Sequence, residues 1–340
     1  MTGSEHVFWA DGRGGVLRPI DTAADIRLIL GSPKVSFSEL IRCIEVAKAT
    51  GDWQLRHEAA ELAFGLAMRE GKVSRITDAA ERYVRSVIRL APDLSSLVPQ
   101  VDAARERLGR SAPSNSEAAS ALQKEQRALD ELALLLGDDQ TETLVRLSGS
   151  LRKFDRSDLA VAAARLAAAA DPNNVAALTT LAAGLADELN FRESREVIET
   201  AIRLNSLDAP ALNVASRILQ AMELPYESLA YAKRAFELDA SRYSAHRLLS
   251  AAAATDDRDA FVEAEQAIEE RDDGPLKDDR WIRSLAVRVL MEAGKLSEAR
   301  AALDSLLKGA SGGQLAKQLS SLKRELSKAE RALQGSLFDL

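Results

Sequence analysis

Three histidines and one cysteine are the residues of this chain with the most versatile side-chain chemistry, as metal ligands, nucleophiles or proton carriers. His6, His57 and His246 lie far apart, and neither they nor Cys43 show the spacing of a metal-binding motif. Cys43 precedes Ile44 in a helical pattern, which favours a packed thiol over a nucleophile. We therefore expect no metal site and no catalytic residue.

Glycines near the N-terminus are the other pattern with a chemical use, because glycine-rich loops bind phosphates. Gly12, Gly14 and Gly15 follow no predicted strand and lack the Gly-Lys-Ser/Thr ending of a phosphate loop. We expect a flexible loop there, no bound cofactor and no enzyme active site within this chain.

The elements that could position binding residues repeat every 34 residues in the middle of the chain. Windows that begin at Thr141, Val175 and Ala209 carry small residues in three matching positions: Ser148, Ala182 and Ser216; Ala160, Ser194 and Ser228; and Ala167, Ala201 and Ala235. Leucines recur between them at helical spacing. Small side chains allow two antiparallel helices to approach closely and allow the next pair to pack behind them.

A helix-turn-helix period of 34 residues with these small positions resembles the tetratricopeptide repeat family, although aliphatic residues replace the first-helix Trp and Tyr of the family pattern. The resemblance covers about 141–313, with five repeats starting near 141, 175, 209, 243 and 280. It implies an all-α fold, a right-handed superhelical α-solenoid of helix hairpins, and a role as a protein-binding scaffold.

Helix starts and breakers predict the organisation of the whole chain. For example, Ser36 and Glu39 form a capping box before one helix, and a Gly-, Ser- and Pro-containing stretch predicts a linker. The predicted parts are an N-terminal extension with one short helix at 1–37, degenerate helical hairpins at 38–110, a linker at 111–117, the repeat array at 118–313, and a heptad-patterned helix and tail at 314–340.

Composition indicates a cytoplasmic protein. The single cysteine suits a reducing compartment, and residues 1–20 lack the pattern of a signal peptide. The most apolar run, 159–170, is too short to span a bilayer. Charge is spread evenly to a net −7 without a basic block, which disfavours nucleic acid as the main partner.

The family resemblance also implies where a partner binds. In this family the first helices of the repeats line a concave groove, and the matching positions here hold six basic and three acidic residues, opposite in sign to the chain's net charge. We expect an acidic protein or peptide to bind there. The residues predicted to contact it are Arg146, Arg152, Lys153, Asn213, Arg217, Arg247, Trp281 and Arg288.

The family's carboxylate clamp for chaperone C-termini is not expected in this groove. Val145, Gly149 and Thr180 occupy the positions where that clamp needs Lys, Asn and Asn.

The C-terminal helix has two features of its own. Leu315, Leu319, Leu322, Leu326, Ala329 and Leu333 form a heptad seam, which predicts either a capping helix over the last repeat or a homodimer through 314–335. After a helix expected to end near Gly335, the residues Gln334, Leu337 and Phe338 resemble the bacterial sliding-clamp-binding pentapeptide.

The sequence therefore predicts a non-catalytic adaptor and leaves three alternatives open. One is an accessory subunit that presents a protein substrate to a separate modifying enzyme. Another is a DNA-linked regulator with a helix-turn-helix at 22–50, although Arg42 and Lys48 are the only cations of its second helix. The third is a sliding-clamp-associated factor that binds through the C-terminal tail.

Overall fold

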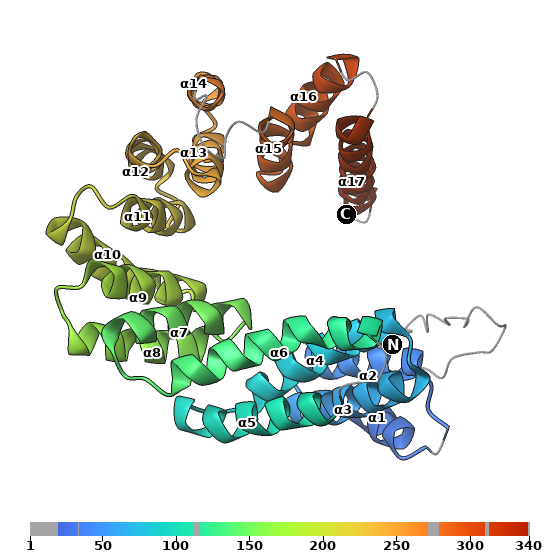
Figure 1. Cartoon of the computed structure of the whole chain (residues 1–340). Helices are drawn as coiled ribbons and strands as arrows, with labels where there is room; N and C mark the ends of the chain where they lie inside the picture. Colours follow the sequence, from blue (N-terminus) through green and yellow to red (C-terminus); the bar gives the residue numbers. More distant parts are fainter. Residues whose placement is uncertain (1–19, 33, 112–115, 271–278, 310–312, 339–340) are drawn as a thin grey trace. The chain divides into compact units, whose positions relative to one another are not determined.

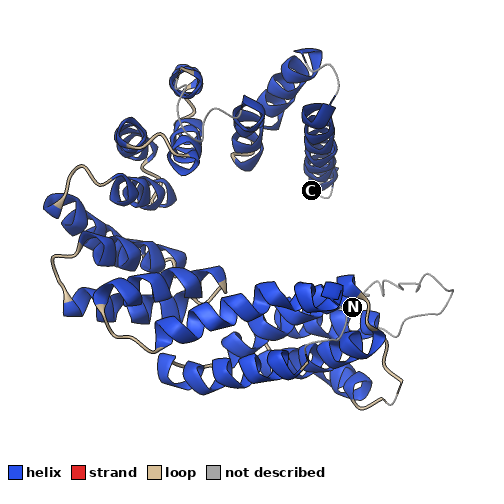
Figure 2. Cartoon of the chain, viewed as in Figure 1, coloured by secondary structure: helices blue, strands red, loops and turns tan. Residues whose placement is uncertain are grey.

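A computed structural model describes residues 20–32, 34–111, 116–270, 279–309 and 313–338. Within these ranges every regular element is a helix, as Figure 2 shows. No helix of this described part is both long and apolar enough to cross a membrane. The chain divides into two compact units, Met1–Ala170 and Asp171–Leu340, so the unit boundary falls inside the predicted repeat array.

The first unit contains eight helices: α1 (Ala23–Leu30), α2 (Phe37–Thr50), α3 (Trp53–Glu70), α4 (Val73–Leu90), α5 (Leu94–Arg110), α6 (Ser116–Leu136), α7 (Thr141–Lys153) and α8 (Ser157–Ala170) (Figure 1). The predicted capping box at the start of α2 is confirmed. Gly51 and Gly71, with φ of 74° and 68°, make the two turns that join α2, α3 and α4, because this left-handed conformation favours glycine. With 18 residues each, α3 and α4 are longer than the 13-residue α7.

Arg156 holds the α7–α8 hairpin to the end of α4. Its side chain is only 2% exposed, and it donates to the carbonyls of Ile88 and Ala91, the latter at 2.7 Å from Nη2. These carbonyls lie at the end of α4, where the helix leaves acceptors unpaired. The Nε and Nη2 of Arg156, which form one edge of the guanidinium, also donate to the two oxygens of the Asp158 carboxylate, at 2.8 and 2.7 Å.

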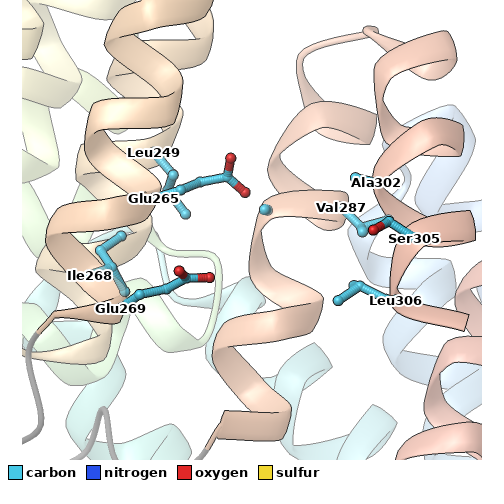
Figure 3. Close-up of a pocket in the computed structure, with 9 residues that line it drawn as sticks. Leu249, Glu265, Ile268, Glu269, Val287, Ala302, Ser305 and Leu306 are labelled. Carbon is cyan, nitrogen blue, oxygen red and sulfur yellow. The ribbon is translucent and has the colours of Figure 1, made fainter. Parts of the chain in front are cut away.

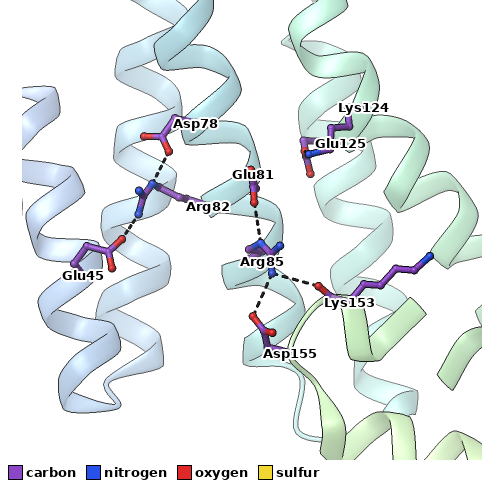
Figure 4. A network of polar contacts seen from close by, with 9 residues as sticks. All are labelled: Glu45, Asp78, Glu81, Arg82, Arg85, Lys124, Glu125, Lys153 and Asp155. Atoms are coloured by element: carbon purple, nitrogen blue, oxygen red, sulfur yellow. Dashed lines mark hydrogen bonds and ion pairs between the residues drawn. The ribbon is translucent and has the colours of Figure 1, made fainter. Parts of the chain in front are cut away.

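Two further arginines of α4 support the same junction. Arg85 reaches the Asp155 carboxylate at 3.2 Å, and Arg89 donates to the Asp155 carbonyl at 3.1 Å. Figure 4 shows Arg85 between Glu81 and Asp155, and Arg82 between Asp78 and Glu45. The first predicted repeat is therefore anchored to the N-terminal helices by arginines.

The second unit contains nine helices: α9 (Val175–Asp187), α10 (Phe191–Leu204), α11 (Ala209–Ala221), α12 (Pro225–Leu238), α13 (Arg242–Ala254), α14 (Arg258–Glu269), α15 (Asp279–Glu292), α16 (Leu296–Gly309) and α17 (Gly313–Phe338). The first eight of them form four successive helix hairpins, and α17 packs on α15 and α16. The predicted all-α fold of successive helix hairpins is confirmed for the described residues.

The small residues lie where the helices of each hairpin meet. All nine predicted positions have no exposed surface: Ser148, Ala160, Ala167, Ala182, Ser194, Ala201, Ser216, Ser228 and Ala235. Ser194 Oγ donates to the Ala182 carbonyl at 2.6 Å, and Ser228 Oγ donates to the Ser216 carbonyl at 2.8 Å. The prediction of close helix approach at these positions is confirmed.

The hairpin turns repeat in the backbone as well. Asp155, Leu189, Glu223 and Asp256 have φ of 59°, 61°, 62° and 57°, and the first three are spaced 34 residues apart. In these three turns, the following N–H bonds to a carbonyl five residues earlier, at 3.0, 2.9 and 2.9 Å. This bond closes a helix end. The side chains gave no sign of this left-handed position, because none of the four residues is a glycine.

The leucine seam of α17 packs inside the second unit. Leu319, Leu322 and Leu326 are at most 1% exposed and belong to the same core as Leu290 and Leu303. This is the packing expected of a capping helix, which covers the apolar face of the last hairpin. A homodimer through 314–335 would have to displace these contacts.

Candidate functional site

The first helices of the hairpins in the second unit, α9, α11, α13 and α15, are joined by polar contacts along one face, which we call the first-helix face. Arg217 of α11 makes two of them. Its Nη1 lies 2.7 Å from Asp187 Oδ1, and its Nη2 donates to the Ala183 carbonyl at 2.8 Å. The Arg217 charge is therefore compensated within the chain.

Asn213 connects α11 to α13. Its Nδ2 donates to Ser244 Oγ at 2.9 Å, and the side chain is almost completely buried. The amide oxygen of Asn213 has no hydrogen-bond partner among the described residues. This predicted partner-binding residue thus also supports the packing of two adjacent hairpins.

Arg247 of α13 is the most unusual group on the first-helix face, because it is a buried cation. Only 7% of the residue is exposed, and its Nη2 donates to Gln220 Oε1 at 2.6 Å and to Ser216 Oγ at 3.3 Å. Both acceptors are uncharged. Within the described part of the chain, no carboxylate pairs with this guanidinium and its Nε has no partner.

Burial lowers the pKa of Arg247, and the positive charge of Arg217 lowers it further, while Tyr243 acts in the opposite direction. A buried charge is costly unless an opposite charge compensates it. An anionic group brought to this site would supply that compensation.

The other predicted contact residues differ in their surroundings. Arg288 of α15 is exposed. The backbone of Trp281 belongs to α15, but its side chain lies outside the described residues. Arg146, Arg152 and Lys153 belong to α7 of the first unit, where Arg146 and Lys153 are exposed and the Lys153 carbonyl accepts from Arg85.

A cavity of about 310 Å³ adjoins Gln220, one of the two acceptors of Arg247. It lies at the ends of α11, α13 and α15, and Gln220 and Ser250 form part of its wall. Lys295 and Asp256, 2.9 Å apart, form another part. The sequence pattern did not predict this cavity, because the turn residues that contribute to it fall outside the first-helix positions.

A second pocket, of about 250 Å³, lies among α13, α14, α15 and α16 (Figure 3). Its wall is mainly apolar, with Leu249, Val287 and Leu306, while Glu265 and Glu269 of α14 contribute carboxylates. Burial raises the pKa of Glu265, and the neighbouring Glu269 charge adds to that effect. The sequence analysis missed this pocket. The sequence feature that points to this pocket is the pair Glu265 and Glu269, four residues apart on an otherwise apolar face of α14.

Cys43, His57 and His246 lie in the described part of the chain, whereas His6 lies outside it. Cys43 is completely buried, and burial raises the pKa of its thiol to about 11. His57 Nδ1 lies 3.0 Å from Ser86 Oγ, and burial lowers its pKa. His246 Nε2 lies 3.3 Å from Glu292 Oε2. In the described ranges, no cluster of three or more His, Cys, Asp or Glu residues could hold a metal ion.

The C-terminal motif differs from its prediction in backbone conformation. The helix α17 continues to Phe338 and does not end near Gly335, because its hydrogen-bonded turns extend through this segment. The side chains of Gln334, Leu337 and Phe338 lie outside the described residues.

Comparison with known proteins gives similarities of fold only. No protein-family model matches the chain, and a search of curated proteins also finds no match. Among solved structures, the chain is similar to a thermophilic TPR protein of Thermus thermophilus, with 19% identity over 56% of this chain and 98% of that chain and a TM-score of 0.42.

Two further solved structures show the same level of similarity. A tetratricopeptide repeat protein from Parabacteroides merdae is 12% identical over 75% of this chain and 87% of its own, with a TM-score of 0.42. Yeast Tom70 is 15% identical over 91% of this chain and 65% of its own, with a TM-score of 0.41. The hairpins and their 34-residue spacing are established by the coordinates of this chain itself.

Proposed function

We propose that this chain is a non-catalytic cytoplasmic adaptor that binds an acidic segment of a protein partner along the first-helix face. The observation that supports this proposal is Arg247, a buried guanidinium whose hydrogen-bond acceptors are neutral. A partner carboxylate would replace or join these acceptors and compensate the charge. Charge-assisted hydrogen bonds of this kind contribute about 1.5–3 kcal/mol each.

Arg217 has a different role in this proposal. Its pairing with Asp187 means that a partner must compete for it, and its side chain is 30% exposed. We therefore assign the main electrostatic contribution to Arg247 and a secondary one to Arg217. The exposed Arg288 would meet the same segment at the edge of the face.

The test begins with a pull-down from an extract of the native cells, with the full chain and its Arg247→Gln variant as parallel baits. A partner retained by the wild type is then mapped to its binding segment, which is synthesised and titrated by calorimetry. We expect the variant to bind this segment roughly tenfold more weakly or worse, since 1.4 kcal/mol corresponds to tenfold.

The matched control is Arg203→Gln, which removes an exposed cation from α10, outside the first-helix face. This variant should bind as the wild type does. Equal affinity of Arg247→Gln and wild type, with the helical circular dichroism of both unchanged, would contradict the proposed site.

A further inference from the structure

The outward side of α17 carries a continuous stripe of six residues, which we call the α17 stripe: Ser320, Lys323, Arg324, Ser327, Lys328 and Arg331. Their spacing of three and four residues places them on one side of a helix. The buried leucines 319, 322 and 326 occupy the other side, which packs on the core. Ser327 borders α16, where its Oγ accepts from Arg300 at 2.9 Å, and the other five residues of the stripe are exposed.

The α17 stripe contains four cations and no acidic residue. Lys323, Arg324 and Lys328 make no hydrogen bond or ion pair with any described residue, and Arg331 Nε bonds only to the carbonyl of Ser327 in its own helix, at 3.0 Å. Two other cations of this unit are paired: Lys233 with Glu263 at 2.8 Å, and Arg300 with Glu330 at 2.5 Å. The positive charge of the stripe is thus not neutralised locally.

The six residues also border an open, shallow surface depression of about 890 Å³ on α17. Ser320 and Ser327 lie seven residues apart, so two small side chains are about two turns apart on this side of the helix. The longer cationic side chains flank them. From Ser320 to Arg331 the helix advances about 17 Å, which matches three turns of a partner helix.

We propose that the α17 stripe is a second docking surface, which binds an acidic α-helix of a protein partner. The serines allow the partner helix to approach closely, as small residues do in helix pairs. The flanking cations pair with carboxylates that recur every three or four residues along it. This surface uses none of the residues of the first-helix face, so the inference does not depend on the proposed function.

Charge and composition favour a protein helix over other anions. Four cations can neutralise few phosphates, and a chain of net charge −7 repels nucleic acid at long range. The stripe has no aromatic residue on which an unpaired base could stack. The apolar side of α17 is buried in the core, so it cannot insert into a lipid surface as an interfacial helix does.

The test uses the full chain and a fluorescein-labelled 18-residue peptide of alanine with glutamates at every third and fourth position, so that the carboxylates share one side of a helix. Binding is followed by fluorescence anisotropy at low and at physiological ionic strength. We expect saturable binding that weakens with salt, and induced helicity of the peptide in circular dichroism. A peptide with glutamine in place of every glutamate should not bind.

The decisive variant replaces the four cations of the α17 stripe with glutamine, as K323Q/R324Q/K328Q/R331Q. We expect at least a tenfold loss of affinity, because each lost ion pair weakens the complex. A control with the same change in net charge but at dispersed exposed positions is R165Q/R192Q/R203Q/R258Q. It should bind the peptide nearly as the wild type does.

Three outcomes would overturn the inference. The first is equal loss of binding in both quadruple variants, which would show a general effect of net charge. The second is loss with Arg247→Gln and none with the stripe variant, which would assign the peptide to the first-helix face. The third is tighter, stripe-dependent binding of a DNA duplex or of phosphatidylserine vesicles than of the peptide.

Discussion

Arg247 Nη2 of α13 lies 2.6 Å from Gln220 Oε1 of α11, so the buried cation of one hairpin is held by a neutral amide of the hairpin before it. Gln220 in turn meets Ser250, with its Oε1 3.4 Å from Ser250 Oγ. This arrangement orients the guanidinium without neutralising it. Because the acceptor is neutral, a carboxylate from outside the chain could still compensate the charge of Arg247.

The first prediction is that Gln220→Glu stabilises the free protein and weakens partner binding. A carboxylate at this position would pair with Arg247, and a charge-assisted bond exceeds a neutral one by about 1 kcal/mol. The free energy of unfolding, measured by urea denaturation at pH 7, should rise accordingly. The same internal carboxylate would compete with the partner's acidic segment.

The pH dependence of this variant follows from the sign of the new pair. Arg247 would depress the pKa of the introduced Glu in the folded state below its ordinary value of about 4.3. The gain in stability should be present above that pH and should disappear as the pH falls through the depressed pKa. A gain that persists at low pH, or one accompanied by tighter partner binding, would contradict the assignment.

The second prediction concerns Asp187, which pairs with Arg217 at 2.7 Å and is 24% exposed in its side chain. Asp187→Asn would release Arg217 for an acidic partner, so the affinity for that partner should increase, by about three- to tenfold if one charge-assisted bond is gained. Titration calorimetry with the partner segment measures this change. Glu196→Gln, on the exposed side of α10, serves as a control with the same loss of negative charge.

Much of the fold could be predicted because small residues and helix breakers report backbone packing directly. Ser216 and Ser228, for example, are conspicuous in an aliphatic helix pattern, and both are buried where α11 and α12 meet. The turn positions could not be predicted in the same way. Leu189 and Glu223 have left-handed backbones that no glycine signals, since the hydrogen bonds of the hairpin impose the conformation.

The candidate site was predicted only as a set of positions. The repeat register placed Arg217 and Arg247 on first helices, but it could not reveal that Asp187 neutralises one and that Gln220 holds the other. Such pairings join residues about 30 positions apart, and they depend on the side-chain conformations of two hairpins. The α17 stripe was not predicted, because the heptad spacing of the leucines describes only the side of the helix that packs on the core.

The third prediction tests the close approach of α11 and α12. Ser228 is completely buried, with its Oγ 3.0 Å from Ser216 Oγ, so Ser228→Leu should push the helices apart and destabilise the second unit by about 1–3 kcal/mol. Ser228→Ala keeps the volume small and should cost only about 1 kcal/mol, the contribution of a hydrogen bond. Hydrogen exchange of the α11 and α12 amides distinguishes the two variants, because exchange should be faster in Ser228→Leu than in Ser228→Ala. Equal protection in both variants would show that the helices do not need a small residue here.

The fourth prediction concerns Asp93, the N-cap of α5, which accepts from the hydroxyls of Ser95 and Ser96 and from the Ser96 N–H at 2.8 Å. These bonds lower its pKa from 3.8 to about 2. Because the folded pKa is depressed, its stabilising effect is present above pH 3.8 and is lost as the pH falls through about 2. In a carbon-detected NMR titration, S95A/S96A should raise this pKa towards 3.8, whereas S150A should leave it unchanged.

The last prediction is that Arg156→Met removes the attachment of the α7–α8 hairpin to α4. The change leaves the carbonyls of Ile88 and Ala91 without their donors and Asp158 without its ion pair, while methionine fills part of the space. Asp158 is half-exposed, so the main loss is at the two carbonyls, and a buried acceptor left without its donor costs about 1–3 kcal/mol. Hydrogen exchange should therefore increase in the last turn of α4 and in α8, but not in the helices of the second unit.

Two controls make this result specific. Arg146→Met replaces an exposed arginine on α7 and should leave exchange unchanged. Arg156→Met combined with Asp158→Leu removes the orphaned carboxylate, so it should recover part of the lost protection in α8 while the end of α4 stays exposed to exchange. If the single variant kept wild-type protection at both places, the hairpin would have to be held by the apolar contacts of α7 and α8 alone, and the arginine would be dispensable to the junction.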